Sequence, residues 1–113
     1  GRDLDDKNRI LSEAKQLENA GAEIILLECV PASLAEEITS SLIIPTIGIG
    51  AGSATDGQIM VCYDAIGVYS WDDQPQPKFV KNFMNESNSI FEAFEKYVSE
   101  VKSLKFPSAD NSF

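Results

Sequence analysis

Residues 24–27 read Ile-Ile-Leu-Leu, and this short apolar run constrains the fold more than any other feature of the sequence. A strand with one face in solvent alternates apolar and polar residues, so four successive apolar residues predict a strand covered on both faces. Residues 46–50, Thr-Ile-Gly-Ile-Gly, form a second short, β-branched run of the same kind. Strands of this type are typical of a parallel sheet flanked by helices.

Amphipathic helical patterns surround these two runs. The segments 4–20, 31–42 and 88–104 carry apolar residues at helical spacing and are predicted to be helices. Gly21 is a natural stop after the first helix, and Pro31 suits the first turn of the second. The apolar positions are Ile10, Leu11, Ala14 and Leu17 in the first helix, Leu34, Ile38 and Leu42 in the second, and Ile90, Phe94, Tyr97 and Val101 in the third.

The segment between the second and third helices is less regular. Residues 58–63, Gln-Ile-Met-Val-Cys-Tyr, are predicted to form a third strand. The gap of residues 51–57 is too short for a helical crossover, which takes about ten residues or more. Either this crossover is degenerate or one strand prediction is wrong, and a helix over residues 58–66 is the alternative. Residues 69–78, with two prolines and two aspartates, are predicted to be a loop.

The order of helices and apolar strands predicts an α/β fold with a parallel sheet. Three parallel strands leave a sheet edge open, which is an aggregation liability. We therefore expect these 113 residues to be part of a larger sheet or barrel. Residue 1 is Gly rather than Met, which also suggests a processed or truncated chain.

Charge and composition narrow the possible partners. The chain has 18 acidic residues, 9 basic residues and no His, for a net charge of −9. Without a basic stripe, binding to nucleic acid or to an anionic membrane is not expected. There is no apolar run of the roughly 18 residues that a membrane helix needs, and no secretory signal is visible. We expect a cytoplasmic location, and no metal site within this chain.

Ligands of α/β folds gather at the carboxyl ends of the strands, which directs attention to two carboxylates. Glu28 directly follows the first apolar run, and partial burial there would raise its pKa toward the range of a general base. The alternative is a strand-end carboxylate that reaches solvent or caps the next helix. Asp64, after Tyr63, is expected at the end of the third strand, where capping of local backbone is more plausible than a ligand role.

Three glycines and both cysteines are also expected near the carboxyl ends of the strands. Gly48, Gly50 and Gly52 could let a substrate approach the backbone, or they could mark a strand with no room for side chains. Their spacing matches neither a dinucleotide fingerprint nor a P-loop. Cys29 and Cys62 have no His partner, so buried, inert thiols are expected.

Several of these motifs together resemble the ketopantoate hydroxymethyltransferase family. The resemblance rests on residues 27–31 (Leu-Glu-Cys-Val-Pro), residues 44–52 (Ile-Pro-Thr-Ile-Gly-Ile-Gly-Ala-Gly) and residues 56–58 (Asp-Gly-Gln). Residues 77–81 and the closing residues 106–113 are also similar to the family's C-terminal region. The combination of the first two motifs is specific, and the match runs in order over nearly the whole chain.

The resemblance implies a fold and a reaction. The family is a (β/α)₈ barrel of the phosphoenolpyruvate/pyruvate superfamily, a fold of roughly 250 residues, so residues 1–113 would be its C-terminal portion without the N-terminal half. The family transfers a one-carbon unit from 5,10-methylenetetrahydrofolate to 3-methyl-2-oxobutanoate, giving 2-dehydropantoate in pantothenate biosynthesis. It is usually a large homo-oligomer.

The resemblance also implies residue roles. Glu28 matches the family's proton acceptor, which removes the proton alpha to the keto group. The family's Mg²⁺, which polarises that keto group, is held by carboxylates in the N-terminal half, so the isolated chain is expected to be inactive. Tyr63 and Asn111 stand where the family often has His. The alternatives are another 2-oxo-acid enzyme of the same superfamily and a non-catalytic half-barrel that associates through its aromatic helix.

Overall fold

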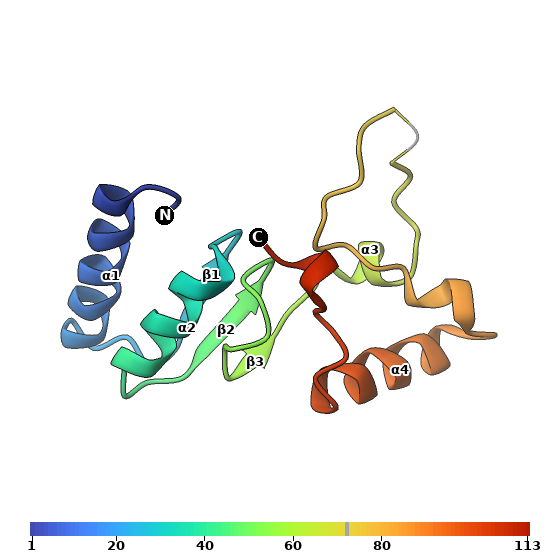
Figure 1. Ribbon diagram of the computed structural model, residues 1–113. Helices are drawn as coiled ribbons and strands as arrows, with labels where there is room; N and C mark the ends of the chain where they lie inside the picture. Colours follow the sequence, from blue (N-terminus) through green and yellow to red (C-terminus); the bar gives the residue numbers. More distant parts are fainter. Residues whose placement is uncertain (72) are drawn as a thin grey trace.

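Three parallel strands form the sheet of this protein, whose computed structural model describes residues 1–71 and 73–113. The strands are β1 (Ile25–Glu28), β2 (Thr46–Ile49) and β3 (Gly57–Gln58), in the spatial order β1-β2-β3 (Figure 1). All four residues of β1 pair with β2, whereas β3 pairs with β2 through two residues only. The predicted parallel α/β arrangement is therefore confirmed.

The three predicted helices are also present. They are α1 (Leu4–Asn19), α2 (Ala32–Ser41) and α4 (Ile90–Lys102), with a short helix α3 (Cys62–Ala65) and two 3₁₀ turns, η1 (Phe83–Glu86) and η2 (Ala109–Asn111). Local side chains explain two of the helix starts. Asp3 accepts a hydrogen bond from the backbone N–H of Asp6 at 2.8 Å, and Ser89 accepts one from Glu92 at 3.1 Å.

The first core joins α1 and α2 to one face of β1. Its buried side chains come from both helices, from the strand and from the residues after β2: Ala14, Ile25, Leu27, Leu34, Ala35, Ile38 and Ala51. The other face of β1 is bare, since Leu26 of the strand is 50% exposed and Ile24, just before the strand, is 54% exposed. The expectation of a strand covered on both faces is thus wrong for this chain, in which helices pack on one face only.

A second core lies apart from the sheet. Phe83, Tyr97 and Phe106 pack edge to face, with ring centroids 5.4 to 6.0 Å apart. Ala65 of α3 and Ala93 of α4 are buried against them. Aromatic side chains that are distant in sequence therefore hold α3, η1 and α4 together.

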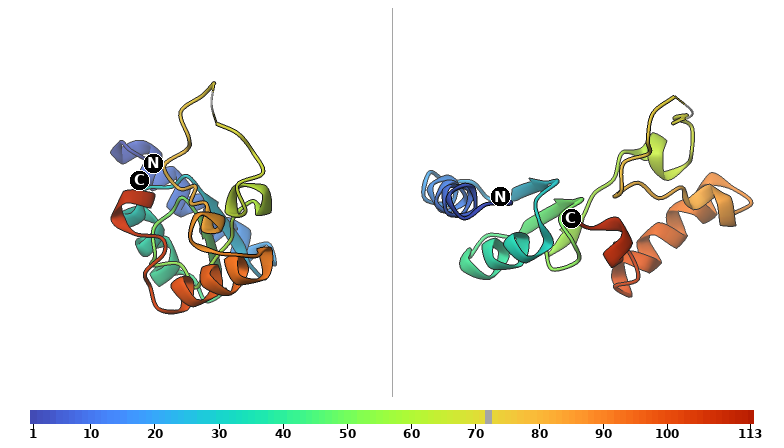
Figure 2. Two further views of the ribbon diagram at one scale, coloured as in Figure 1. Left: turned by 90° about the vertical axis from the view of Figure 1, so that its right-hand side faces the viewer. Right: turned by 45° about the horizontal axis from the view of Figure 1, so that its top comes forward.

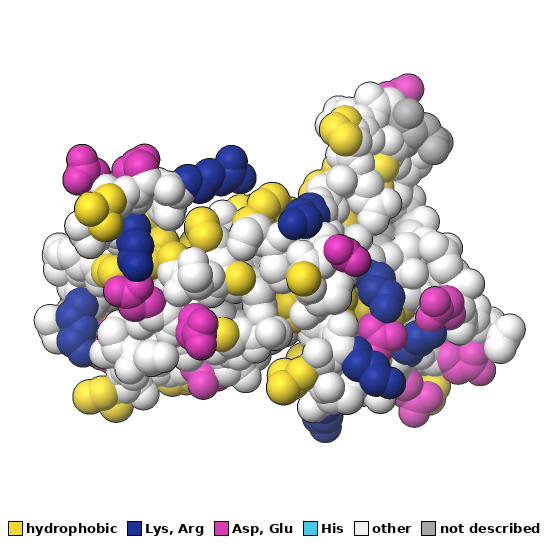
Figure 3. Space-filling view, in the orientation of Figure 1, with side chains coloured by type: hydrophobic (Ala, Val, Ile, Leu, Met, Phe, Trp, Pro, Cys, Tyr) yellow, Lys and Arg dark blue, Asp and Glu magenta, His cyan; other side chains and the backbone are white. Residues whose placement is uncertain are grey.

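The chain consequently has two lobes, a sheet lobe of residues 1–58 and a helical lobe of residues 59–106. Figures 1 and 2 show the two lobes side by side, with the C-terminal segment returning to the strand ends. In the space-filling view the molecule is narrower between the two lobes (Figure 3). The radius of gyration is 15.1 Å, whereas a compact domain of this length is expected to have about 13 Å. The longest dimension is 44 Å against 28 and 21 Å for the others.

The predicted third strand is wrong over most of its length. Only Gly57 and Gln58 pair with β2, and the chain turns into α3 at Cys62, so the helical alternative holds for residues 62–65. The crossover between β2 and β3 is also degenerate, because residues 50–56 contain no helix. A short apolar run such as residues 59–63 does not by itself distinguish a strand from a buried helix.

The predicted loop of residues 69–78 contains no helix or strand where it is described, and Asp72 lies outside the described residues. Within the described part of the chain, no helix is long and apolar enough to cross a membrane.

Candidate functional site

Glu28 is the last residue of β1, at the carboxyl end of a parallel strand, as the sequence predicts. It lies opposite Ile49 in the strand register, and the next backbone N–H, that of Cys29, donates to the Ile49 carbonyl at 2.9 Å. Cys29 then adopts a left-handed conformation, with φ +53°, so the chain turns sharply out of the sheet. These contacts place the Glu28 backbone firmly beside the end of β2.

The Glu28 side chain is exposed, so the partial burial expected for it is absent in this chain. It forms no ion pair with any residue that the structure describes. A carboxylate in this position is free to accept a proton from a molecule bound at the strand ends. Its geometry fits the predicted role of a proton acceptor, and the role itself stays a prediction.

Gly48, Gly50 and Gly52 each have a packing reason to be glycine. A Cβ on Gly48 would lie 2.8 Å from the Thr55 hydroxyl oxygen, and one on Gly52 would lie 2.6 Å from the Ala32 Cβ. Gly50 has φ +63°, and its missing Cβ would lie 3.0 Å from the ring of Phe79. Neighbouring side chains of this chain thus occupy the space that the glycines leave. Their predicted contact with substrate stays a prediction.

The motif of residues 56–58 holds the connection between β2 and β3. The Gln58 amide donates to the Gly52 carbonyl and to the Thr55 hydroxyl, both at 2.9 Å. The Asp56 carboxylate accepts from the backbone N–H of Thr46 at 2.8 Å and from its hydroxyl at 3.3 Å. The side chains of this motif therefore order the helix-free crossover. Asp56 binds at the amino end of β2, whereas Glu28 lies at the opposite edge of the sheet, at the carboxyl end of β1.

The end of the chain closes over the carboxyl end of β2. The Phe113 carbonyl accepts from the backbone N–H of Ala32 at 2.8 Å, and its ring lies 6.3 Å from that of Phe79. The Asn111 amide donates to the Lys78 carbonyl at 3.2 Å, and the Lys78 ammonium donates to the Ser112 carbonyl. Sequence reasoning did not place these residues at the site, because only the tertiary structure brings residue 113 next to residue 32.

Tyr63 and Asp64 are not at a strand end. Both lie in α3, in the helical lobe, where Tyr63 is exposed and Asp64 is buried. The expectation that Asp64 follows a third strand is wrong, since that strand ends at Gln58. The structure therefore does not bring the Asp64 position to the end of a strand beside Glu28.

Both cysteines are exposed, which contradicts the expectation of buried thiols. Partial desolvation of the thiol nevertheless raises the pKa of Cys29 above its ordinary value, and the negative charge of Glu28 raises it further. Since the thiolate is the nucleophile, a raised pKa argues against nucleophilic chemistry at Cys29.

No cluster of three His, Cys, Asp or Glu residues suited to a metal ion occurs among the described residues. The side chains described here therefore do not fit a complete Mg²⁺ site by themselves, because that ion is held by carboxylates together with other oxygen ligands.

Comparison with known proteins decides the family. A family model described as ketopantoate hydroxymethyltransferase matches residues 1–109. The chain belongs to the ketopantoate hydroxymethyltransferase family. Relatives named 3-methyl-2-oxobutanoate hydroxymethyltransferase are 50% identical in Shewanella sp. (strain ANA-3), 48% in Pseudoalteromonas translucida and 47% in Buchnera aphidicola subsp. Acyrthosiphon pisum. Each comparison covers all 113 residues of this chain.

The chain spans 42% of the length of each of these relatives. Membership of the ketopantoate hydroxymethyltransferase family confirms the resemblance drawn from the sequence motifs.

Proposed function

We propose that this chain forms part of a hydroxymethyltransferase that moves a one-carbon unit from 5,10-methylenetetrahydrofolate to 3-methyl-2-oxobutanoate, giving 2-dehydropantoate. The observation that carries the proposal is the position of Glu28. It ends a parallel strand inside the family segment of residues 27–31, and the chain is 47 to 50% identical to relatives named for this reaction.

In this proposal Glu28 is the proton acceptor. Its carboxylate takes the proton on the carbon next to the keto group, and the electron pair of that C–H bond becomes the enolate. The methylene carbon of the folate is bonded to two nitrogens, and both bonds break: the first opens before the enolate carbon bonds to the methylene carbon, and water then displaces the second nitrogen and supplies the hydroxyl oxygen. The two folate nitrogens end protonated, one by the proton that Glu28 took from the substrate and one by a proton of that water. Glu28 suits the first step because it is unpaired and lies at the end of the sheet where ligands bind in α/β folds.

The finer fold that we propose is the C-terminal portion of a (β/α)₈ barrel, with β1 to β3 as its last three strands. Two features support this. The sheet is parallel throughout, and Leu26 of β1 and Ile24 just before the strand are exposed on the face that the helices leave bare. In a barrel, inward-facing branched side chains of this kind fill the interior.

The ligands of the Mg²⁺ that the family implies are proposed to lie outside these 113 residues, and no step above depends on that ion. The inactivity of the isolated chain, the cytoplasmic location and the homo-oligomeric state of the complete enzyme stay predictions. Another 2-oxo-acid enzyme of the same superfamily would reveal itself by C–C cleavage products instead of 2-dehydropantoate.

The test is Glu28→Gln in the complete enzyme, because the amide keeps the shape of the side chain and cannot accept the proton. We expect kcat to fall by about 10²- to 10⁴-fold. The matched control is Glu23→Gln, an exposed residue just before the other end of β1, which should leave kcat within a few-fold. If the Glu28 variant also turned over within a few-fold of the unmodified enzyme, the proton-acceptor assignment would be wrong.

A further inference from the structure

The turn that follows Glu28 is held by one hydrogen bond at each of its ends. At the first end the backbone N–H of Cys29 donates to the last carbonyl of β2 at 2.9 Å. At the second end the N–H of Ala32, the first residue of α2, donates to the Phe113 carbonyl at 2.8 Å. Only residues 30–31 lie between these two bonds. The turn is therefore fixed from one side by the sheet and from the other by a residue distant in the chain.

The bond from Phe113 takes the place of a side-chain cap on α2. The first N–H groups of a helix have no partner within the helix. The residue before α2 is Pro31, whose side chain cannot accept a hydrogen bond. The Phe113 carbonyl supplies the missing acceptor for Ala32. The segment of residues 107–113, called the strap below, thus fixes where α2 begins.

The strap is itself anchored at the end of β2, beside the carboxyl ends of the first two strands (Figure 1). The Phe113 ring lies against Gly50, where an added Cβ would be 3.1 Å from the ring, and 6.3 Å from the ring of Phe79. The Asn111 amide donates to the Lys78 carbonyl at 3.2 Å, and the Lys78 ammonium donates back to a carbonyl of the strap. The strap therefore ties the start of α2 to the end of β2.

This second anchor matters because the turn is strained at Cys29. A φ of +53° is uncommon for a residue that has a side chain. Such conformations persist only where the surrounding contacts impose them. If the turn were released at Ala32, Cys29 could leave the left-handed region, and the backbone that directs Glu28 would move with it. The Glu28 carboxylate forms no ion pair with any described residue that would hold it in place instead.

We propose that the strap positions Glu28 for proton abstraction, with Asn111 and Phe113 as positioning residues that act through Ala32 and the turn. The proposal rests on the proton-acceptor role proposed for Glu28 above. A displacement of about 1 Å in a reacting group can lower a rate about 10²-fold. Loss of the strap contacts is therefore expected to slow proton transfer. Binding of the keto acid should change little, because Glu28 takes a proton from it and does not hold it.

Hydrogen exchange on the substrate isolates this step in the complete enzyme supplied with Mg²⁺. With 3-methyl-2-oxobutanoate in heavy water and no folate, the Glu28 carboxylate takes the proton next to the keto group, exchanges it with solvent and returns a deuteron. One C–H bond becomes a C–D bond, and nothing else changes. NMR gives the exchange rate, which is divided by the amount of keto acid bound. A role in folding alone would reduce the number of occupied sites and leave the rate per occupied site unchanged.

Ala32→Pro removes the hydrogen bond to Phe113 with little change to the helix. Proline is favoured at the first position of a helix, and the ψ of +135° at Pro31 is compatible with a following proline. We expect the exchange rate per occupied site to fall about 10- to 10²-fold. The matched control is Ile90→Pro, which places proline at the first residue of α4 after an extended residue, and it should leave the rate unchanged.

A milder pair of variants tests the other anchor. Asn111→Leu removes the donor to the Lys78 carbonyl and is expected to lower the exchange rate per occupied site about fivefold. Asn111→His keeps an N–H donor, so it should restore the rate. Circular dichroism verifies the fold of each variant, and the Asn111 pair decides the question if Ala32→Pro does not fold.

Two results would overturn different parts of the scheme. Unchanged rates per occupied site in folded Ala32→Pro and Asn111→Leu enzymes, while Glu28→Gln abolishes the exchange, would overturn the positioning role of the strap and leave the proton-acceptor role intact. Exchange that continues in Glu28→Gln would overturn the proton-acceptor role itself.

Discussion

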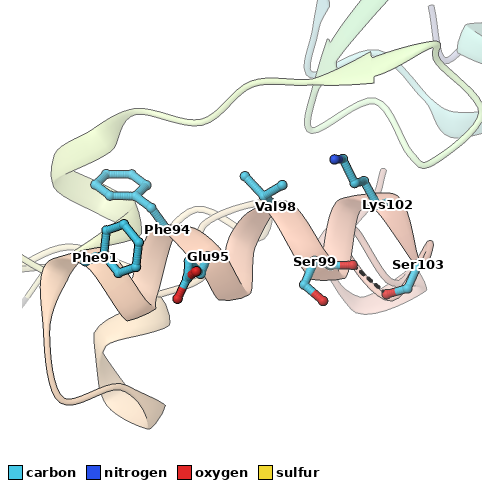
Figure 4. Close-up of a pocket in the computed structure, with 7 residues that line it drawn as sticks. All are labelled: Phe91, Phe94, Glu95, Val98, Ser99, Lys102 and Ser103. Atoms are coloured by element: carbon cyan, nitrogen blue, oxygen red, sulfur yellow. Dashed lines mark hydrogen bonds between the residues drawn. The ribbon is translucent and has the colours of Figure 1, made fainter.

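The sheet lobe and the helical lobe are held together by different kinds of contact. The core of the sheet lobe consists of aliphatic side chains and alanines that come from neighbouring elements in the chain order. The core of the helical lobe consists of three aromatic rings, from residues 83, 97 and 106, that meet edge to face. The candidate site belongs to the sheet lobe, and the exposed apolar side of α4, with Phe91, Phe94 and Val98, belongs to the helical lobe (Figure 4).

This difference shows where alternating helices and paired strands are enough to order a chain. In the sheet lobe, helices and strands alternate, and each strand pairs with the next one. In the helical lobe the described residues between α3 and α4 (66–71 and 73–89) have no regular elements other than a 3₁₀ turn, so packing of a few large rings replaces backbone pairing. The lobes are therefore expected to respond separately to changes in their cores.

The largest expected effects come from emptying each core in turn. Phe83 is fully buried in the helical lobe, and its replacement by Ala should cost ~3–5 kcal/mol. Leu34 is fully buried in the sheet lobe, and Leu34→Ala should cost ~2–5 kcal/mol. Amide hydrogen exchange should show protection falling in α4 for the first variant and in α1 and α2 for the second. Equal loss of protection in both lobes for either variant would mean that they unfold as one unit.

A smaller effect is expected at the turn beside the candidate site. Gly52 has φ +76°, and a Cβ there would lie 2.6 Å from the Ala32 Cβ. Gly52→Ala therefore combines left-handed backbone with a clash, for a cost of ~1–3 kcal/mol in the free energy of unfolding.

Gly21→Ala is the matched control for Gly52→Ala. Gly21 has φ +99°, but a Cβ there would meet nothing within 4 Å. Thermal or denaturant unfolding should find the Gly52 variant clearly less stable than the Gly21 variant. Equal losses would mean that backbone conformation alone, and not packing against α2, requires glycine after β2.

The smallest expected effect concerns the thiol next to Glu28. Desolvation and the Glu28 carboxylate both raise the pKa of Cys29. Glu28→Gln removes the negative charge, so the pKa of Cys29 should move down toward its ordinary value. The pH dependence of alkylation by iodoacetamide, measured in a Cys62→Ser background, reports this pKa. An unchanged profile would show that Glu28 and the thiol do not interact electrostatically.

The comparison of the lobes also shows how far sequence reasoning reached. The spacing of apolar residues located α1, α2 and α4, and the two apolar runs located β1 and β2. Glu28 was found as well, because a strand end is a local feature of the sequence. The strand predicted over residues 58–63 was wrong over most of its length, because strand and helix patterns are alike over so short a stretch. In addition, β3 has a partner strand on only one side.

By itself, then, the sequence determined the class of fold, the three long helices, the two main strands and the position of the candidate carboxylate. These depend on periodicity and on strand ends, which are properties of consecutive residues. Only the tertiary structure decided which strand face stays bare, that both cysteines are exposed, and that Phe113 closes on Ala32. It also decided which side of α4 turns outward. Those outcomes depend on contacts between residues far apart in the chain. The energies of such contacts cannot be inferred from the pattern of consecutive residues.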